Sequence, residues 1–182
     1  MRRPIDITDF LTNLADKLGD RDPDALVPAY QVFANNKTST SDPMDGVLAA
    51  MGNNPEAALE YLTPEGDGSV DGDGNWVPDD KARQRWEKLT SRDWDCDFTM
   101  SASDKPTAAD GLTSAVAAAS SFRNPGPGED GAVSSDAAQR DAAATYTSGM
   151  GVDYFSGDSW SRDEFTDTMK HNLAVVVANS PE

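Results

Sequence analysis

Apolar residues recur along this chain at helical spacing, in short runs that are separated by proline, glycine and aspartate. The first run falls at i, i+3, i+4, i+7 and i+11, and it consists of Ile7, Phe10, Leu11, Leu14 and Leu18. Residues at this spacing lie on one face of a helix. Asp6, Thr8 or Asp9 can cap its start, and Gly19 stands where helices commonly end. The run therefore predicts an amphipathic helix over residues 7–18.

Further runs of the same kind follow along the rest of the chain. They predict helices near 23–33, 43–51, 55–62, 79–92, 107–122, 135–150 and 161–179. Pro43 and Pro55 stand in the first turns of two of these helices, where the missing N–H is not needed, and Asn54 caps the second of them. Pro28 falls inside the 23–33 run, so it kinks that helix or shifts its start.

The last three helices carry their own start and stop signals. Thr107 and Asp110 have the spacing of a capping box with Asp in place of Glu, and Ser161 and Glu164 form the standard box. Two glycines, Gly149 and Gly151, are predicted to end the 135–150 helix. The 107–122 and 135–150 helices are rich in alanine, and small side chains allow close approach. We therefore expect these two helices at the centre of the fold.

These elements predict an all-α protein, a compact bundle of six to eight helices that forms one domain over 1–182. Segments 64–79, 95–106 and 123–134 are rich in Asp, Gly or Pro and are expected to be flexible loops. The first of them has an Asp-Gly-Asp-Gly-Asn turn between short apolar pairs, a pattern compatible with a small hairpin. An apolar run over 173–179 ends three residues before the last residue, which favours a piece of a longer protein.

Acidic residues dominate the charge of the chain. There are 32 Asp and Glu against 15 Lys and Arg, which gives a net charge of −17, and 25 of the acids are Asp. This balance disfavours a nucleic-acid-binding surface, because phosphates are bound by Lys and Arg. The acids are spread over the chain and gather in loops, which indicates a solvated, self-repelling surface rather than a mimic of the nucleic-acid backbone or a decoy for a basic partner.

The chain has one Cys and one His, which excludes an internal disulfide and a Cys/His zinc site. Asp95 and Asp97 flank Cys96 and oppose thiolate formation, so a nucleophilic role is not expected. His171, on the last predicted helix, is expected to pack at the edge of the core or to lie on the surface. No run reaches the ~18 apolar residues of a transmembrane helix, and no apolar signal-peptide core follows Met1. The chain is therefore expected in the cytoplasm, or outside it without a cleaved signal peptide.

The strongest motif for chemistry is an acidic loop that resembles part of a calcium site. Asp67, Ser69, Asp71 and Gly72 match the first six positions of an EF-hand loop, but the twelfth position is proline rather than the bidentate Glu. Starting the count at Asp71 places Trp where the glycine should be. A weaker Ca²⁺ site of another kind remains open, and it would use Asp67, Asp71, Asp73 and Asn75. The alternative is a solvated turn.

Several strings together resemble a known family. They are Leu-Val-Pro-Ala-Tyr-Gln-Val-Phe-Ala-Asn at 26–35, the segment 42–61, Thr-Ser-Arg-Asp-Trp at 90–94, and Phe-Thr-Asp-Thr-Met-Lys-His-Asn-Leu-Ala at 165–174. They are similar to an uncharacterised helical family found in large proteins of Streptomyces and related actinobacteria. The resemblance implies a helical part of a longer chain, often linked to Trp-x-Gly modules of type VII secretion. It implies no catalytic residues, and this chain has no Trp-x-Gly.

Three functions are therefore open at the level of sequence. The favoured hypothesis is a non-enzymatic helical module that acts by contact with a protein partner, within an actinobacterial protein exported by a type VII route. The second is a hydrolase that uses buried carboxylates or an acid-bound metal. The third is an extracellular domain stabilised by calcium. Buried carboxylates in a cleft favour the second hypothesis, and converging oxygens in the 67–75 loop favour the third.

Overall fold

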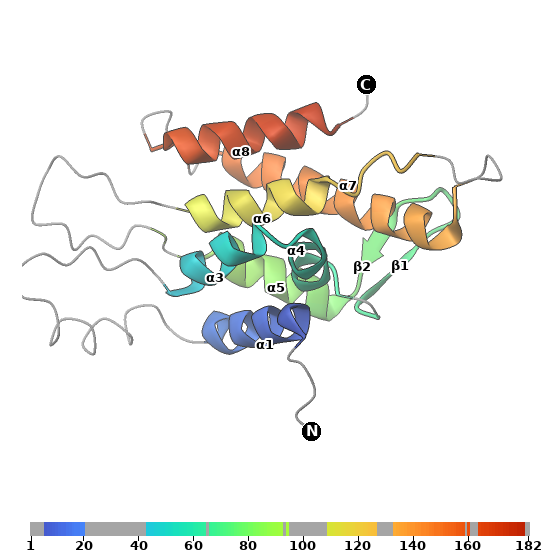
Figure 1. The fold of residues 1–182 in the computed structure, drawn as a ribbon, viewed down its shortest axis with the longest axis horizontal. Coiled ribbons are helices and arrows are strands. Elements are labelled where there is room, and N and C mark those ends of the chain that lie inside the picture. The colour runs from blue at the N-terminus through green and yellow to red at the C-terminus, as the bar shows by residue number, and fades with distance from the viewer. Residues whose placement is uncertain are drawn as a thin grey trace, which may run out of the picture.

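The computed structural model confirms the all-α prediction (Figure 1). It describes residues 6–20, 43–64, 66–92, 94, 109–126, 133–158, 160 and 164–180. Within these ranges the chain forms seven helices and one antiparallel pair of short strands. They are α1 (Ile7–Gly19), α3 (Pro43–Met51), α4 (Pro55–Leu62), β1 (Gly68–Val70), β2 (Trp76–Pro78), α5 (Asp80–Thr90), α6 (Asp110–Ser120), α7 (Ser135–Ser156) and α8 (Asp167–Ala178).

The first helices begin where their caps predict. The Asp6 carboxylate accepts a hydrogen bond from the N–H of Thr8 at the start of α1, and Asn54 accepts one from Ala57 at the start of α4. The apolar stripe of α3 is buried as predicted. Its members are Met44, Val47, Leu48 and Met51. These elements follow from local signals because capping and apolar periodicity act within one turn.

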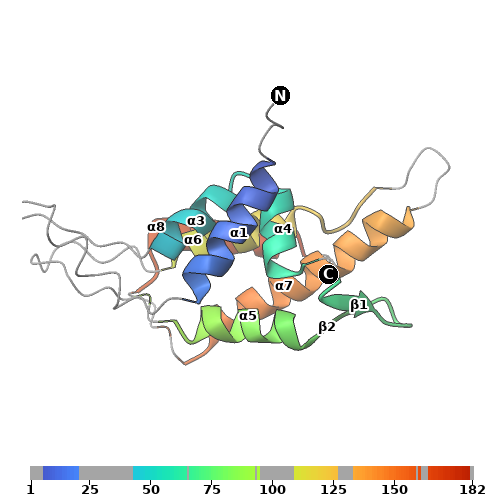
Figure 2. The same ribbon diagram turned by 90° about the horizontal axis from the view of Figure 1, so that it is seen from below.

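Helix α1 departs from its predicted stripe at one end. Leu11 is buried with Ala15, whereas Ile7 and Phe10 are 54% and 50% exposed. Figure 2 shows α1 lying across α3 and α4 at the edge of the bundle. The first turn of this helix therefore extends past the core, whereas the part from Leu11 to Leu18 packs against it.

Helix α6 is the centre of the fold, as its small side chains predict. It packs against α3, α4, α7 and α8, and Figure 1 shows it between α8 on one side and α3 and α4 on the other. All of its residues from Gly111 to Ser120 are buried except the half-buried Ser114. Alanine and glycine let neighbouring backbones approach this helix closely, which explains how a chain with few large apolar residues builds a core.

The predicted capping box of α6 is wrong. The helix begins at Asp110 after Ala109, which has a positive φ of 57° and supplies no side-chain cap. Instead, the N–H of Gly111 donates a 2.6 Å hydrogen bond to the carboxylate of Asp45 in α3. A long-range hydrogen bond therefore replaces the local cap. Thr107 lies outside the described residues.

Helix α7 also differs from its prediction, because Gly149 and Gly151 do not end it. It continues for another turn and more, to Ser156. Gly151 is buried against α6, where an added Cβ would lie 2.8 Å from a methyl group of Val116. The glycine is needed for close packing rather than for termination, so tertiary contact overrides its weak helix propensity.

Helix α8 begins later than the Ser161–Glu164 box predicts. Its cap is Thr166, whose hydroxyl accepts a hydrogen bond from the N–H of Met169. The box lies upstream: Ser161 is outside the described residues, and Glu164 precedes the helix. Two asparagines of the helix region, Asn172 and Asn179, tie it to α6 by donating to side-chain hydroxyls there. These buried polar contacts were not foreseen from the apolar pattern.

The predicted hairpin in 64–79 is present. Strands β1 and β2 pair antiparallel with Ser69 opposite Val77, and Gly74 takes the positive φ of 85° that the turn needs. Trp76 turns inward and is buried, and Val77 on the other face is 41% exposed. The predicted 23–33 helix and the 95–106 segment lie outside the described residues. Among those described, none of the helices is long and apolar enough to span a bilayer.

Two glycines of α7 test the packing of α6 against α7. We expect Gly151→Ala to lower the free energy of unfolding by about 1–3 kcal/mol, because the new methyl group overlaps Val116. Gly149→Ala is the matched control, since nothing lies within 4 Å of its Cβ position and the residue is exposed. This control should gain up to about 1 kcal/mol from helix propensity. Urea unfolding measures both, and equal effects of the two variants would contradict the assigned packing.

Candidate functional site

Helix α5 carries an unusual concentration of positive charge for so acidic a chain. Five of the 15 basic residues fall within 81–92. Four of them recur at i, i+4, i+7 and i+11, and they are Lys81, Arg85, Lys88 and Arg92. This spacing places the first three along one face of α5, and Arg92 follows just after the helix ends at Thr90. We call these four residues the basic row.

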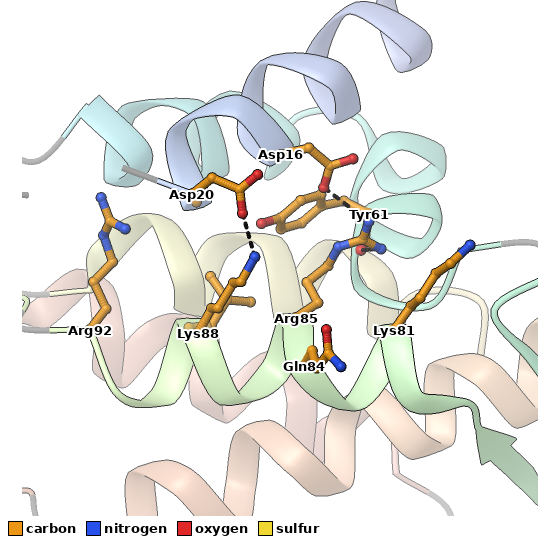
Figure 3. Close-up of a pocket in the computed structure, with 10 residues that line it drawn as sticks. Asp16, Asp20, Tyr61, Lys81, Gln84, Arg85, Lys88 and Arg92 are labelled. Atoms are coloured by element: carbon orange, nitrogen blue, oxygen red, sulfur yellow. Dashed lines mark hydrogen bonds and ion pairs between the residues drawn. The ribbon is translucent and has the colours of Figure 1, made fainter. Parts of the chain in front are cut away.

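The basic row lines one wall of a pocket of about 280 Å³ between α1, α4 and α5. Figure 3 shows Asp16 and Asp20 reaching toward it from α1, with Tyr61 of α4 between the two helices. The remaining lining residues are Gly19, Gln84 and Leu89. Three helices that are far apart in the sequence therefore build this pocket.

Arg85 is the structural member of the row. Its guanidinium donates to the backbone carbonyl of Tyr61 at 2.8 Å and to the Asp16 carboxylate at 2.9 Å, and it stacks 4.9 Å from the centre of the Tyr61 ring. A planar guanidinium can satisfy all three contacts at once, whereas a lysine cannot. Arg85 therefore fixes α1 and α4 to α5.

The other cations are closer to solvent. Lys88 pairs with Asp20, and the two side chains are 52% and 69% exposed. Lys81 lies 3.6 Å from Asp67 and is 77% exposed. Counting four basic groups and the two carboxylates of α1, the lining of the pocket carries a formal charge of +2. Exposed pairs of this kind contribute at most about 1 kcal/mol, so an incoming anion can compete for these lysines.

Tyr61 forms the inner wall of the pocket. The residue is only 2% exposed, and burial raises the pKa of its phenol well above the usual value, although nearby Arg85 opposes the shift. Figure 3 shows its hydroxyl pointing toward Asp20 and Lys88. Within the described part of the chain, no hydrogen bond reaches this hydroxyl. The pocket thus contains a protonated phenol whose donor is unused.

A comparison with known protein families gives this chain a place among them. A family of unknown function, DUF6571, matches residues 8–182. The chain belongs to this family. No curated protein and no solved structure matches it. The resemblance to an uncharacterised helical family is confirmed at this level, and membership assigns no activity to the pocket.

Sequence reasoning missed the pocket of this DUF6571 member. The spacing of the basic row is present in the sequence. However, the net charge of −17 does not reveal this local excess of positive charge. Nothing in the sequence around Tyr61 singles it out. Its role depends on α1 and α5 closing over it, and no local pattern encodes that approach.

The residues predicted to bind calcium are divided between the two ends of the hairpin. Asp71, Asp73 and Asn75 meet at the turn, where the Asp71 carboxylate accepts hydrogen bonds from the N–H groups of the other two. Asp67 precedes β1 and Asp71 follows it, four positions along an extended chain, which separates the two residues by about 13 Å. Asp67 instead pairs with Lys81. Calcium binding by these residues stays a prediction.

The remaining candidates lie apart from the pocket. His171 is exposed on α8, and Cys96 lies outside the described residues. A second pocket of about 350 Å³ lies between α4, α7 and β2. Its lining includes Glu56, Glu60, Asp136 and Arg140, and Arg140 forms an ion pair with Glu56. Among the described residues, no group of three or more His, Cys, Asp or Glu side chains is arranged to hold a metal ion.

The geometry of the turn predicts that the contribution of Asp71 to the stability of the fold depends on pH. Hydrogen bonds from the backbone of Asn75 and then Asp73 lower the pKa of its carboxyl below the ordinary 3.8. A group with a lowered pKa stabilises the fold above its unfolded value, and that contribution is lost as the pH falls through the folded value. We expect the carboxyl ¹³C signal of Asp71 to titrate with a midpoint below 3.8.

Asp71→Asn should remove this acid-dependent part of the stability, whereas Asp73→Asn serves as the matched control. The Asp73 side chain accepts none of the hydrogen bonds described for the turn. Thermal unfolding between pH 3 and pH 6 compares the two variants. An Asp71 midpoint at or above 3.8 would contradict the turn geometry.

Proposed function

We propose that this chain is a non-enzymatic binding module that receives an acidic segment of a protein partner on the exposed face of α5. The observation that carries the proposal is the basic row in an otherwise acidic chain. A local excess of positive charge beside a pocket attracts carboxylate-bearing or other anionic groups, even where the net charge of the whole protein is negative.

The contacts of the pocket favour binding over catalysis. Its two carboxylates are both engaged, Asp16 with Arg85 and Asp20 with Lys88. Acid–base catalysis by a pair of carboxyl groups needs carboxyls that are within reach of the substrate. Both acids are instead committed to ion pairs that hold α1 against α5, which suits a surface that recognises charge.

The setting of the module is part of the same proposal. By the resemblance of its sequence, the module belongs to a large actinobacterial protein that leaves the cell by a type VII route. The partner would then meet the module within that larger assembly or outside the cell. The binding face does not depend on this setting, so the two parts can be tested separately.

The first test uses a fluorescent hexaglutamate peptide as the acidic probe. We expect Lys81→Gln with Lys88→Gln to weaken binding about tenfold, because two favourable charge contacts of up to about 1 kcal/mol each are lost. Fluorescence anisotropy at low salt measures the affinity. Raising the salt to 0.5 M should weaken wild-type binding strongly, since exposed charges are screened.

A charge-matched double variant provides the control. Arg83→Gln with Lys170→Gln removes the same number of charges from exposed positions outside the pocket. Arg83 pairs with Asp80 and donates to the Pro78 carbonyl, and Lys170 pairs with Asp167. The affinity of this double variant for the probe should stay within twofold of wild type. Equal losses in the two double variants would mean nonspecific attraction and would refute the proposed face. Absence of any binding by the wild type would refute the proposal as a whole.

A further inference from the structure

We infer that the pocket between α1, α4 and α5 binds a phosphate monoester dianion, with the Tyr61 hydroxyl donating to one of its oxygens and Lys88 supplying the facing charge. This inference deepens the proposed function and rests on it, because it names the chemical group that the acidic ligand presents. A free phosphate ester and a phosphorylated side chain share this group, and the experiment below separates them.

The first argument is the unused donor. Tyr61 is 2% exposed, it lines the pocket, and no hydrogen bond within the described part of the chain reaches its hydroxyl. The hydroxyl oxygen is not one of the described buried atoms that lack a partner, so it reaches the solvent of the pocket and is available there as a donor. An added Cβ on Gly19 would lie 3.7 Å from the hydroxyl oxygen, so α1 approaches it without covering it by a side chain. The open side of the phenol is the pocket.

The protonation of the phenol agrees with a role as donor. Burial raises the pKa of Tyr61, so the hydroxyl keeps its proton throughout the neutral range. A protonated phenol donates well to an oxyanion, and a hydrogen bond to a charged acceptor is roughly twice as strong as one between neutral groups. The protonated phenol is neutral and does not repel an anion, whereas a phenolate would.

The second argument is the charge of the pocket. Four basic groups and two carboxylates line it, which gives the lining a formal charge of +2, while Lys81 also pairs with Asp67 and Arg92 has a partner of its own. A dianionic phosphate monoester is attracted to this excess more strongly than a singly charged carboxylate is. The volume of about 280 Å³ lies at the low end for small-molecule sites. It suits a phosphoryl group with a short part of its ester, rather than a dinucleotide.

The third argument is that the entrance can open without unfolding. The Asp20 side chain is 69% exposed, so its carboxylate can rotate toward the solvent when a phosphate replaces it as the partner of Lys88. Arg85 holds α1 and α4 through its separate contacts with Asp16 and the Tyr61 carbonyl, and these contacts do not involve Lys88. A structural arginine therefore maintains the pocket while the exposed lysine exchanges partners.

The decisive variant is Tyr61→Phe, which removes the hydroxyl and keeps the ring that stacks on Arg85. We expect its midpoint of thermal unfolding to match wild type, since the hydroxyl forms no internal hydrogen bond among the described residues. Inorganic phosphate, followed by NMR and calorimetry, should bind this variant about tenfold more weakly than wild type. Lys88→Gln should weaken phosphate similarly, and Arg83→Gln should stay within twofold.

The pH dependence separates a dianion from a monoanion. Phosphate affinity should rise between pH 5.5 and 7.5 as the ligand loses its second proton, whose pKa is ~6 for a phosphorylated side chain. The charged or titratable groups that line the pocket are Asp16 and Asp20 from α1 and its C-cap, Tyr61 from α4, Lys81, Arg85 and Lys88 from α5, and Arg92 just after α5. Side chains of these types ordinarily titrate outside that interval. Acetate should show no such rise.

Two peptides then distinguish the sources of the phosphoryl group. A phosphoserine peptide that binds more tightly than inorganic phosphate, and more tightly than its unphosphorylated form, identifies a phosphorylated side chain. Binding of inorganic phosphate without gain from the peptide identifies a small phosphate ester. Both results support the inference, provided that Tyr61→Phe weakens the binding that is measured in each.

Other outcomes overturn the inference. Equal phosphate affinity in wild type and Tyr61→Phe, or no phosphate binding at millimolar concentration, refutes the phosphoryl site. If hexaglutamate still binds in a manner that depends on Lys81 and Lys88, the proposed acidic-partner face survives this failure. If hexaglutamate also fails to bind, the proposed function and the inference fall together.

Discussion

The close approach of neighbouring helices to α6 is the constraint on which the rest of the structure depends. An added Cβ on Gly111 would lie 2.0 Å from the backbone oxygen of Asp45, and one on Gly151 would overlap Val116. These contacts place α3 and α7 directly against the central helix. Because the helix offers mostly small side chains, the burial per residue is small, and dense packing over its whole length has to supply the core. Polar contacts then secure α8, through Asn172 and Asn179.

Helix α1 is held by a different kind of interaction. It contributes only Leu11 and Ala15 to the buried core, so apolar packing alone fixes it weakly. Its attachment to α5 relies on Arg85, which is 17% exposed and reaches both Asp16 and the Tyr61 carbonyl. A hydrogen-bonded, partly buried ion pair contributes more than an exposed one. The side of α1 that faces α5 is therefore fixed by charge, and this leaves a polar pocket between the helices rather than an apolar seam.

Local signals predicted most of this fold and failed at identifiable places. Asp6, Asn54 and Asp79 cap their helices because a side chain and the N–H groups it serves lie within three residues. The start of α6 was misplaced because its cap comes from Asp45, 66 residues earlier in the chain. The end of α7 was misplaced because Gly151 serves contact with α6. The pocket was missed for the same reason: its walls come from three helices, and only the spacing of the basic row was encoded locally.

The net charge of this protein and its basic row act over different distances. The net charge of −17 acts over the whole surface and keeps molecules apart. The basic row acts within a few ångströms, and salt screens the distant acids more than it screens groups that touch the ligand. A ligand that reaches Lys88 and the Tyr61 hydroxyl therefore meets the local field rather than the global one. The surrounding acids also disfavour anions that are held only by diffuse attraction.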